Sequence, residues 1–132
     1  MPLFKLTESL SVAAQITPQD IPNLAEQGFT AVVCNRPDGE VPGQATMDEI
    51  EAACHAADLL FVRYPVDAMN FPGPDIEGLG ALFDDPGQSV LAYCRTGTRC
   101  ANLWVTSQTG EGQAEAVQLA REIGFDLSLV RA

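Results

Sequence analysis

The sequence has few of the residues that build metal centres, disulfide frameworks or surfaces for polyanions. It contains one histidine, His55, and four cysteines, none of which forms a Cys-x-x-Cys pair. This composition argues against a zinc site and a disulfide framework, so we expect free thiols in a reducing compartment, the cytoplasm. Only 7 Lys and Arg residues stand against 18 Asp and Glu residues, which excludes a basic surface for nucleic acid or anionic lipid.

Long apolar runs are also missing. No run approaches the roughly 18 apolar residues of a membrane span. The first residues lack the long apolar core and the small-residue cleavage site of a secretory signal. With 132 residues, of which 46% are hydrophobic, the chain is long enough to bury one core, and we expect a single domain over residues 1–132.

Apolar stretches of strand length alternate with stretches of helix length along the chain. Strands are predicted at 29–35, 59–64 and 90–93, with one or two short ones within 3–16. Helices are predicted at 17–27, 46–57, 75–83, 99–108 and 111–123. This alternation indicates an α/β fold with a central parallel sheet flanked by helices. Ligands bind at the carboxyl ends of the strands in such sheets, where the loops at 36–39, 65–74 and 94–99 should meet.

The stretch from Val90 to Arg99 has the strongest functional signal. Val90-Leu91-Ala92-Tyr93 predicts a buried strand, Cys94-Arg95-Thr96-Gly97-Thr98-Arg99 predicts a tight turn, and a helix follows from about Cys100. A turn of this kind at a helix start directs backbone N–H groups and the positive end of the helix dipole at an anion. These donors would favour the thiolate form of the cysteine. We therefore predict that Cys94 is a nucleophile and Arg99 its catalytic partner. The anion-binding loop would comprise Arg95, Thr96, Gly97 and Thr98.

The remaining thiols and the histidine carry weaker signals. Cys100 falls in the first turn of the predicted helix, where it would either resolve an oxidised or persulfidated Cys94 or pack as a small residue under the loop. Cys34 and Cys54 lie on apolar faces and are predicted to belong to the core, whereas His55 is predicted to lie on the surface. A Cys-His pair of the papain kind is therefore not indicated.

Three loop aspartates are candidates for a general acid, because a leaving group that departs as an anion has to be protonated. Asp67 is preferred over Asp38 and Asp75 because it comes soon after a strand end. The alternative for each is a turn or helix-cap residue. Arg36 would either add a cation at the rim of the site or remain a solvated loop residue.

Three segments carry a family resemblance that covers nearly the full length of the chain. They are V-A-A-Q-I-T-P-Q-D (12–20), N-R-P-D-G-E (35–40) and A-Y-C-R-T-G-T-R (92–99). With them the chain resembles the phosphatase-like domain of the beta-lactamase-hydrolase-like proteins, a bacterial family also named for sulfur transfer. The resemblance implies a protein-tyrosine-phosphatase-like fold with the cysteine loop between a strand and a helix. Some members are fused to a persulfide dioxygenase, which for this chain is expected to be a separate partner.

The residues around Cys94 depart from the phosphatase pattern, in which His precedes the cysteine, five residues separate it from Arg, and Ser or Thr follows. Here Tyr93 precedes it, four residues intervene, and Cys100 follows Arg99. Rhodanese-type sulfurtransferases usually have four intervening residues, and the shorter loop suits a persulfide sulfur better than a phosphate. The sequence therefore predicts a sulfurtransferase.

In the predicted reaction, the Cys94 thiolate takes a sulfane sulfur from a small anionic donor such as thiosulfate and passes it to a thiol or cyanide. The loop amides and the Arg99 guanidinium would stabilise the anionic sulfur, with no metal or organic cofactor. One alternative is a phosphatase that attacks a phosphoester with Cys94 and protonates the leaving oxygen with Asp67. The other is a non-enzymatic anion-binding or redox-sensing module that uses Cys94 and Cys100.

Overall fold

A five-stranded sheet forms the centre of the molecule, with the strand order β1-β2-β5-β3-β4. The computed structural model describes residues 2–131. The strands are β1 (Phe4–Lys5), β2 (Leu10–Ala13), β3 (Ala31–Cys34), β4 (Leu60–Arg63) and β5 (Val90–Tyr93). Because β5 lies between β2 and β3, the strand that leads into Cys94 occupies the middle of the sheet.

The predicted α/β fold is confirmed, although the sheet is mixed rather than wholly parallel. β2, β3, β4 and β5 run parallel, whereas β1 pairs with β2 in the antiparallel direction. Only residues 6–9 connect β1 to β2. A parallel pair needs a crossover of about a dozen residues or more, so this short connection forces a hairpin at the edge of the sheet.

Both faces of the inner strands are buried, which explains their unbroken apolar sequences. In β5, Val90 and Ala92 belong to one core cluster, whereas Leu91 and Tyr93 belong to the other. The pleat of the strand produces this alternation, because successive side chains leave on opposite faces. The sheet thus separates two hydrophobic cores.

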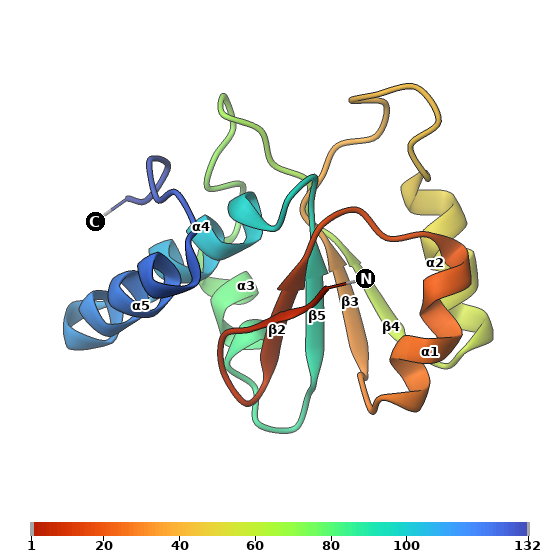
Figure 1. Cartoon of the computed structure of the whole chain (residues 1–132), viewed down its shortest axis with the longest axis horizontal. Helices are drawn as coiled ribbons and strands as arrows, with labels where there is room; N and C mark the ends of the chain where they lie inside the picture. Colours follow the sequence, from red (N-terminus) through yellow and green to blue (C-terminus); the bar gives the residue numbers. More distant parts are fainter. Residues whose placement is uncertain (1, 132) are drawn as a thin grey trace.

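Helices cover both faces of the sheet (Figure 1). A short 3-10 turn (Pro18–Asp20), α1 (Ile21–Glu26) and α2 (Met47–Ala56) lie on one side. The other side is covered by α3 (Ile76–Phe83), α4 (Thr98–Ser107) and α5 (Gly110–Ile123). Over residues 2–131, no helix combines the length and the apolar character that crossing a membrane requires.

Two of the helix starts follow from capping residues in the sequence. Thr46 Oγ1 accepts a hydrogen bond from the Glu49 N–H at 3.2 Å, and the Glu49 carboxylate accepts one from the Thr46 N–H at 3.2 Å. Asp75 likewise accepts from the Gly78 N–H at 2.9 Å at the start of α3. The helix predicted over 17–27 begins instead as a 3-10 turn, because Pro22 has no N–H to donate to the preceding turn.

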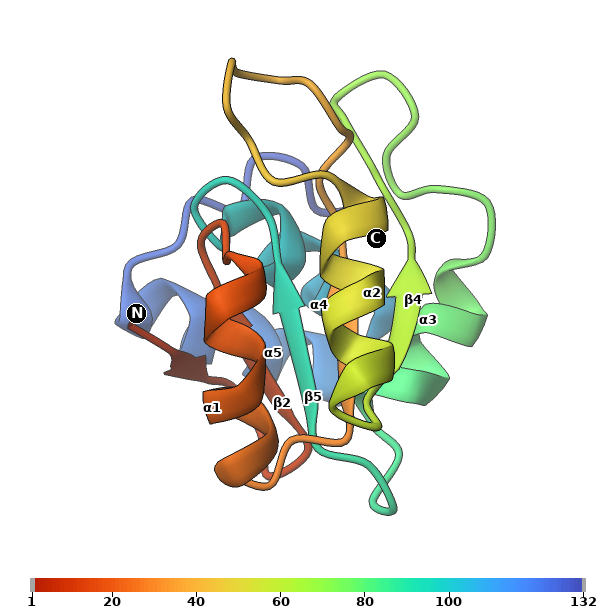
Figure 2. The same cartoon turned by 90° about the vertical axis from the view of Figure 1, so that its right-hand side faces the viewer.

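The carboxyl ends of the parallel strands carry the loops that the sequence predicts to form the site. Figures 1 and 2 both show the loops after β3, β4 and β5 at this edge of the sheet. Arg36 follows β3, Val66 follows β4 and Cys94 follows β5. The parallel topology thus brings together residues that are far apart in the sequence.

Candidate active site

The Cys94 loop connects β5 to α4 and begins where β5 leaves the sheet. The Cys94 N–H still donates to the Ala13 carbonyl of β2 at 3.2 Å, so the sheet holds the start of the loop. Gly97 has a left-handed backbone with φ of +89° and is the N-cap residue of α4. Its N–H donates to the sulfur of Cys94, at an N–Sγ distance of 3.1 Å. The predicted order of strand, glycine-containing turn and helix is confirmed.

The pKa of Cys94 is lowered to about 6, although the residue is only 1% exposed. The largest cause is a hydrogen bond from the Cys100 thiol, and the backbone N–H groups of Cys100, Thr96 and Arg99 add further donors. Burial acts in the opposite direction, because it penalises the charged form. The donors outweigh burial, so Cys94 is mainly a thiolate at neutral pH, which is the reactive form of the side chain.

Cys100 lies in the first turn of α4 and is completely buried. Burial raises the pKa of its thiol, and the neighbouring Cys94 raises it further. Cys100 is therefore a protonated donor beside a thiolate. Both are free thiols, as are Cys34 and Cys54, which lie in the core as the sequence predicts. This position agrees with a residue packed under the loop, and a resolving role for Cys100 stays a prediction.

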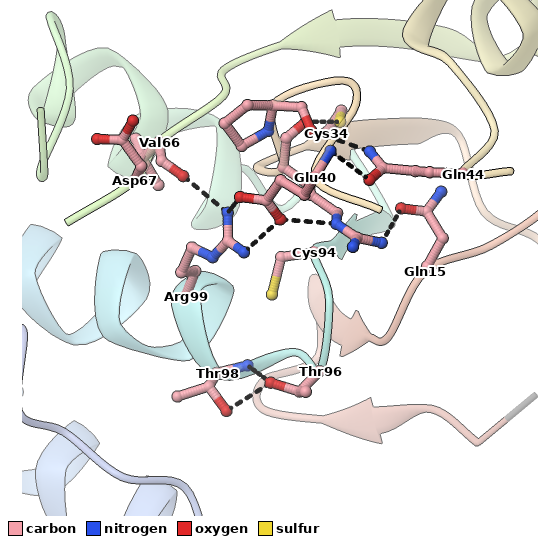
Figure 3. A network of polar contacts seen from close by, with 12 residues as sticks. Gln15, Cys34, Glu40, Gln44, Val66, Asp67, Cys94, Thr96, Thr98 and Arg99 are labelled. Carbon is pink, nitrogen blue, oxygen red and sulfur yellow. Dashed lines mark hydrogen bonds and ion pairs between the residues drawn. The ribbon is translucent and has the colours of Figure 1, made fainter. Parts of the chain in front are cut away.

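Arg99 reaches from the start of α4 to the loops that follow β3 and β4 (Figure 3). Its Nη1 and Nη2 atoms pair with the two carboxylate oxygens of Glu40 at 2.9 and 2.7 Å. Nη1 also donates to the Val66 carbonyl at 2.9 Å. The guanidinium lies close enough to Cys94 for their charges to interact. Arg99 therefore links the predicted nucleophile to both neighbouring loops.

Glu40 binds a second arginine as well. Arg36 Nε donates to Glu40 Oε1 at 2.8 Å, and Arg36 Nη1 donates to Gln15 Oε1 at 3.0 Å. The Arg36 side chain is only 3% exposed, so it is a buried member of the network and not a solvated loop residue. The hydrogen bond from Arg99 holds the pKa of Glu40 below its usual value, and Arg36 adds to this effect. Glu40 is thus a stable carboxylate between two guanidinium groups.

The sequence interpretation missed Glu40 and Gln15. Neither belongs to a recognisable catalytic pattern, and each finds its arginine partner through the sheet topology or a loop contact. The signal that could have found them is their position inside the segments 12–20 and 35–40, which carry the family resemblance.

The structure does not bring the Asp67 carboxylate to the thiol. Its Oδ1 accepts hydrogen bonds from the N–H groups of Met69 and Asn70 at 2.9 and 3.0 Å, so it caps the turn that follows. Figure 3 shows the carboxylate directed away from the cysteine. Asp38 and Asp75 also accept backbone N–H bonds, at the starts of α2 and α3. The geometry favours the turn or cap alternative for all three, and an acid role for Asp67 would require its turn to open.

The other side chains of the loop are turned to solvent or to each other. Arg95 and Thr96 are exposed, and the Thr96 hydroxyl donates to Thr98 Oγ1 at 2.9 Å. The backbone N–H groups, rather than these side chains, therefore surround the sulfur. Within residues 2–131, no three His, Cys, Asp or Glu side chains are grouped as they would be around a metal ion.

The whole network falls within a segment that matches a known family. The family model of the beta-lactamase hydrolase-like protein, phosphatase-like domain, matches residues 3–111. The chain belongs to this family. The phosphatase-like domain is 30% identical over 130 residues to the beta-lactamase hydrolase-like protein of Agrobacterium fabrum. The match covers 96% of this chain and 30% of the relative, so the chain spans 30% of the length of that protein.

Solved structures share the fold of this phosphatase-like domain. A candidate phosphatase from Neisseria meningitidis is 34% identical and has a TM-score of 0.81, over 97% of this chain and 92% of that chain. PTPMT1, solved in complex with PI(5)P, is 17% identical and has a TM-score of 0.71, over 98% of this chain and 86% of that chain. The phosphatase-like domain therefore has the fold of the protein tyrosine phosphatases, as the resemblance implies.

These comparisons favour the phosphatase alternative over the predicted sulfurtransferase. The family description names a phosphatase-like domain and the Neisseria structure is described as a candidate phosphatase, whereas neither names sulfur transfer. The sulfurtransferase prediction depends on the residues around Cys94, above all on the short spacing to Arg99.

Proposed function

We propose that this phosphatase-like domain is a cysteine-dependent phosphatase that hydrolyses phosphate monoesters through Cys94. The observation that carries the proposal is the Cys94 thiol, whose pKa is lowered to about 6 by the Cys100 thiol and by backbone N–H groups at the start of α4. Amides arranged in this way suit the oxygens of a phosphoryl group. The Neisseria relative described as a candidate phosphatase, and PTPMT1 with its bound PI(5)P, support the same class of substrate.

The reaction would proceed in two displacements. The Cys94 thiolate attacks phosphorus, an S–P bond forms, and the P–O bond of the ester breaks. The departing oxygen takes a proton from water or from an acid near the site. Water then hydrolyses the phosphocysteine to inorganic phosphate and regenerates the thiolate. The loop N–H groups would stabilise the phosphoryl oxygens in both steps, and Arg99 would add a bidentate cation.

The departures from the phosphatase pattern do not separate Cys94 from the N–H donors of its turn. Tyr93 is buried in the core, so the position before the cysteine serves packing. Cys100 stands at the position where the pattern has Ser or Thr, and its thiol donates a hydrogen bond to the sulfur of Cys94. The shorter turn remains as the main difference, because one residue fewer provides one N–H fewer around a tetrahedral group.

The substitution Cys94→Ser tests the proposal with an aryl phosphate as substrate. We expect turnover to fall by several orders of magnitude, because a serine hydroxyl is not ionised near neutral pH. Cys54→Ser is the matched control, since it makes the same exchange in the core away from the loop. Hydrolysis that persists in Cys94→Ser, or that is absent from the unsubstituted protein, would exclude the proposed phosphatase.

A sulfurtransferase is the second candidate, favoured by the four residues between Cys94 and Arg99. It predicts that incubation with thiosulfate adds the mass of one sulfur to the protein and that Cys94→Ser abolishes this addition. Transfer from thiosulfate to cyanide without aryl phosphate hydrolysis would replace the phosphatase proposal. The non-enzymatic alternative predicts anion binding or a reversible disulfide between Cys94 and Cys100 with neither kind of turnover.

A further inference from the structure

Two arginines, Arg36 in the loop after β3 and Arg99 in the first turn of α4, converge on the carboxylate of Glu40. Arg36 Nε lies 2.8 Å and Arg99 Nη2 lies 2.7 Å from the same oxygen, Oε1. Arg99 Nη1 lies 2.9 Å from the other oxygen, Oε2. One carboxylate thus holds two guanidinium groups together, and the charge of one of them, Arg99, interacts with that of the predicted nucleophile, Cys94.

Each guanidinium has a second anchor that does not depend on Glu40. Arg36 donates to Gln15 Oε1 at 3.0 Å, and Arg99 donates to the Val66 carbonyl at 2.9 Å. The side chains are 3% and 18% exposed, so the protein rather than solvent sets their positions. Both cations would therefore keep their positions if the carboxylate left.

Of Arg36, Arg99 and Glu40, Glu40 is the side chain that can move out of the group. It lies in the exposed stretch 38–43, where its own N–H donates to Gln44 Oε1 at 3.2 Å. Gln44 Nε2 in turn donates to the Pro37 carbonyl at 2.9 Å, so the loop backbone is braced from within. A rotation of the Glu40 side chain alone would release both arginines and would leave these backbone hydrogen bonds intact.

We propose that Arg36 and Arg99 form a two-cation subsite for the dianionic phosphate of the substrate, and that Glu40 fills this subsite until the phosphate displaces its carboxylate. The inference rests on the phosphatase function proposed above, and it adds a binding residue, Arg36, and a selectivity for charge. Among these three side chains, two guanidinium groups face one carboxylate, while the nearby Cys94 thiolate is stabilised mainly by the Cys100 thiol and the loop N–H groups. A dianion compensates both charges, whereas a monoanion gains nothing over the carboxylate already present. The subsite therefore favours phosphate monoesters over phosphodiesters.

Calorimetric titration with inorganic phosphate, at a pH where it is a dianion, tests whether Glu40 occupies the subsite. Glu40→Gln should bind phosphate about tenfold more tightly or better, because the competing carboxylate no longer reduces the fraction of open subsites. Glu51→Gln is the matched control, since it removes a carboxylate from Arg63 on the surface, and its affinity should equal that of the unsubstituted protein. Equal affinities of Glu40→Gln and Glu51→Gln would overturn the proposal.

The contribution of Arg36 is tested in the Glu40→Gln background. Adding Arg36→Met removes the second cation without leaving an unpaired carboxylate, and should weaken phosphate binding by about tenfold or more. In the unsubstituted protein, the Arg36 Nε–H resonance should shift when phosphate saturates the site, a measurement that does not depend on the folding of any variant. A resonance that stays unshifted at saturation would overturn the role of Arg36.

These measurements separate the subsite from the phosphatase reaction, because none of them requires turnover. If aryl phosphate is not hydrolysed but phosphate binds with the expected pattern, the phosphatase proposal fails and the subsite stands. If hydrolysis proceeds but Glu40→Gln and its Arg36→Met derivative bind phosphate equally well, the subsite fails and the phosphatase stands.

Discussion

Cys94 is the predicted nucleophile of the site, and its pKa of about 6 keeps it a thiolate near neutral pH. We expect the ultraviolet absorbance of the thiolate to appear as the pH rises through about 6 and to be absent from Cys94→Ser. Cys100→Ala should move the midpoint to higher pH, because it removes the donor with the largest effect. Cys54 does not interfere, since burial raises its pKa to about 11. A midpoint at the ordinary value of a free thiol would contradict the thiolate.

The variant Asp67→Asn tests whether the loop after β4, in its observed conformation, supplies a general acid. Asp67→Asn should change kcat on an aryl phosphate by less than about twofold, because an amide oxygen can accept the same turn hydrogen bonds from Met69 and Asn70. The measurement is kcat at saturating substrate. A fall of about a hundredfold, the size typical of a lost general acid, would instead show that the turn opens during the reaction.

At the scale of the element, the turn between β5 and α4 depends on the backbone of Gly97. Its φ of +89° is strained for other residues, and a Cβ there would lie 3.4 Å from Phe125 Cε1. Gly97→Ala should lower the free energy of unfolding by about 1–2 kcal/mol. It should also raise the titration midpoint of Cys94, because the Gly97 N–H would shift away from the sulfur.

Gly28→Ala is the control for this prediction. Gly28 has a similar φ of +96°, and a Cβ there meets nothing within 4 Å. The two variants should lose comparable stability in denaturant unfolding, but only Gly97→Ala should change the titration of Cys94. Identical midpoints in the two variants would mean that the turn geometry does not tune the thiol.

For the whole molecule, stability depends on the apolar side chains that the helices bury against the two faces of the sheet. Leu103 lies on α4, is completely buried and belongs to the core between the sheet and α3, α4 and α5. Leu103→Ala should lower the free energy of unfolding by about 2–5 kcal/mol. Leu60→Ala, at a position that is 50% exposed on β4, should cost no more than about 0.5 kcal/mol. Similar losses of stability for the two variants in denaturant unfolding would contradict the assignment of Leu103 to the core and of Leu60 to the surface.

Local patterns predicted most of the elements because their causes lie within a few residues of each other. Thr46 and Glu49 form their capping box across three residues, and the pleat of β5 alternates its side chains between the two cores. The edge hairpin was the part of the sheet that the prediction missed, since the apolar alternation within 3–16 did not distinguish one strand from two. The Cys94 loop was predictable as well, because the strand, the glycine and the helix start that define it are neighbours in the sequence.

The sequence by itself determined the α/β architecture and the turn that holds Cys94, because a strand, a glycine turn and a helix start are contiguous in the chain. Only the tertiary structure decided which charges surround that cysteine. Glu40 and Arg99 are 59 residues apart, and Gln15 and Arg36 are 21 apart. They meet because the order β2-β5-β3 places three strand ends side by side at one edge. Contacts of this kind follow from strand order, which no local pattern of residues encodes.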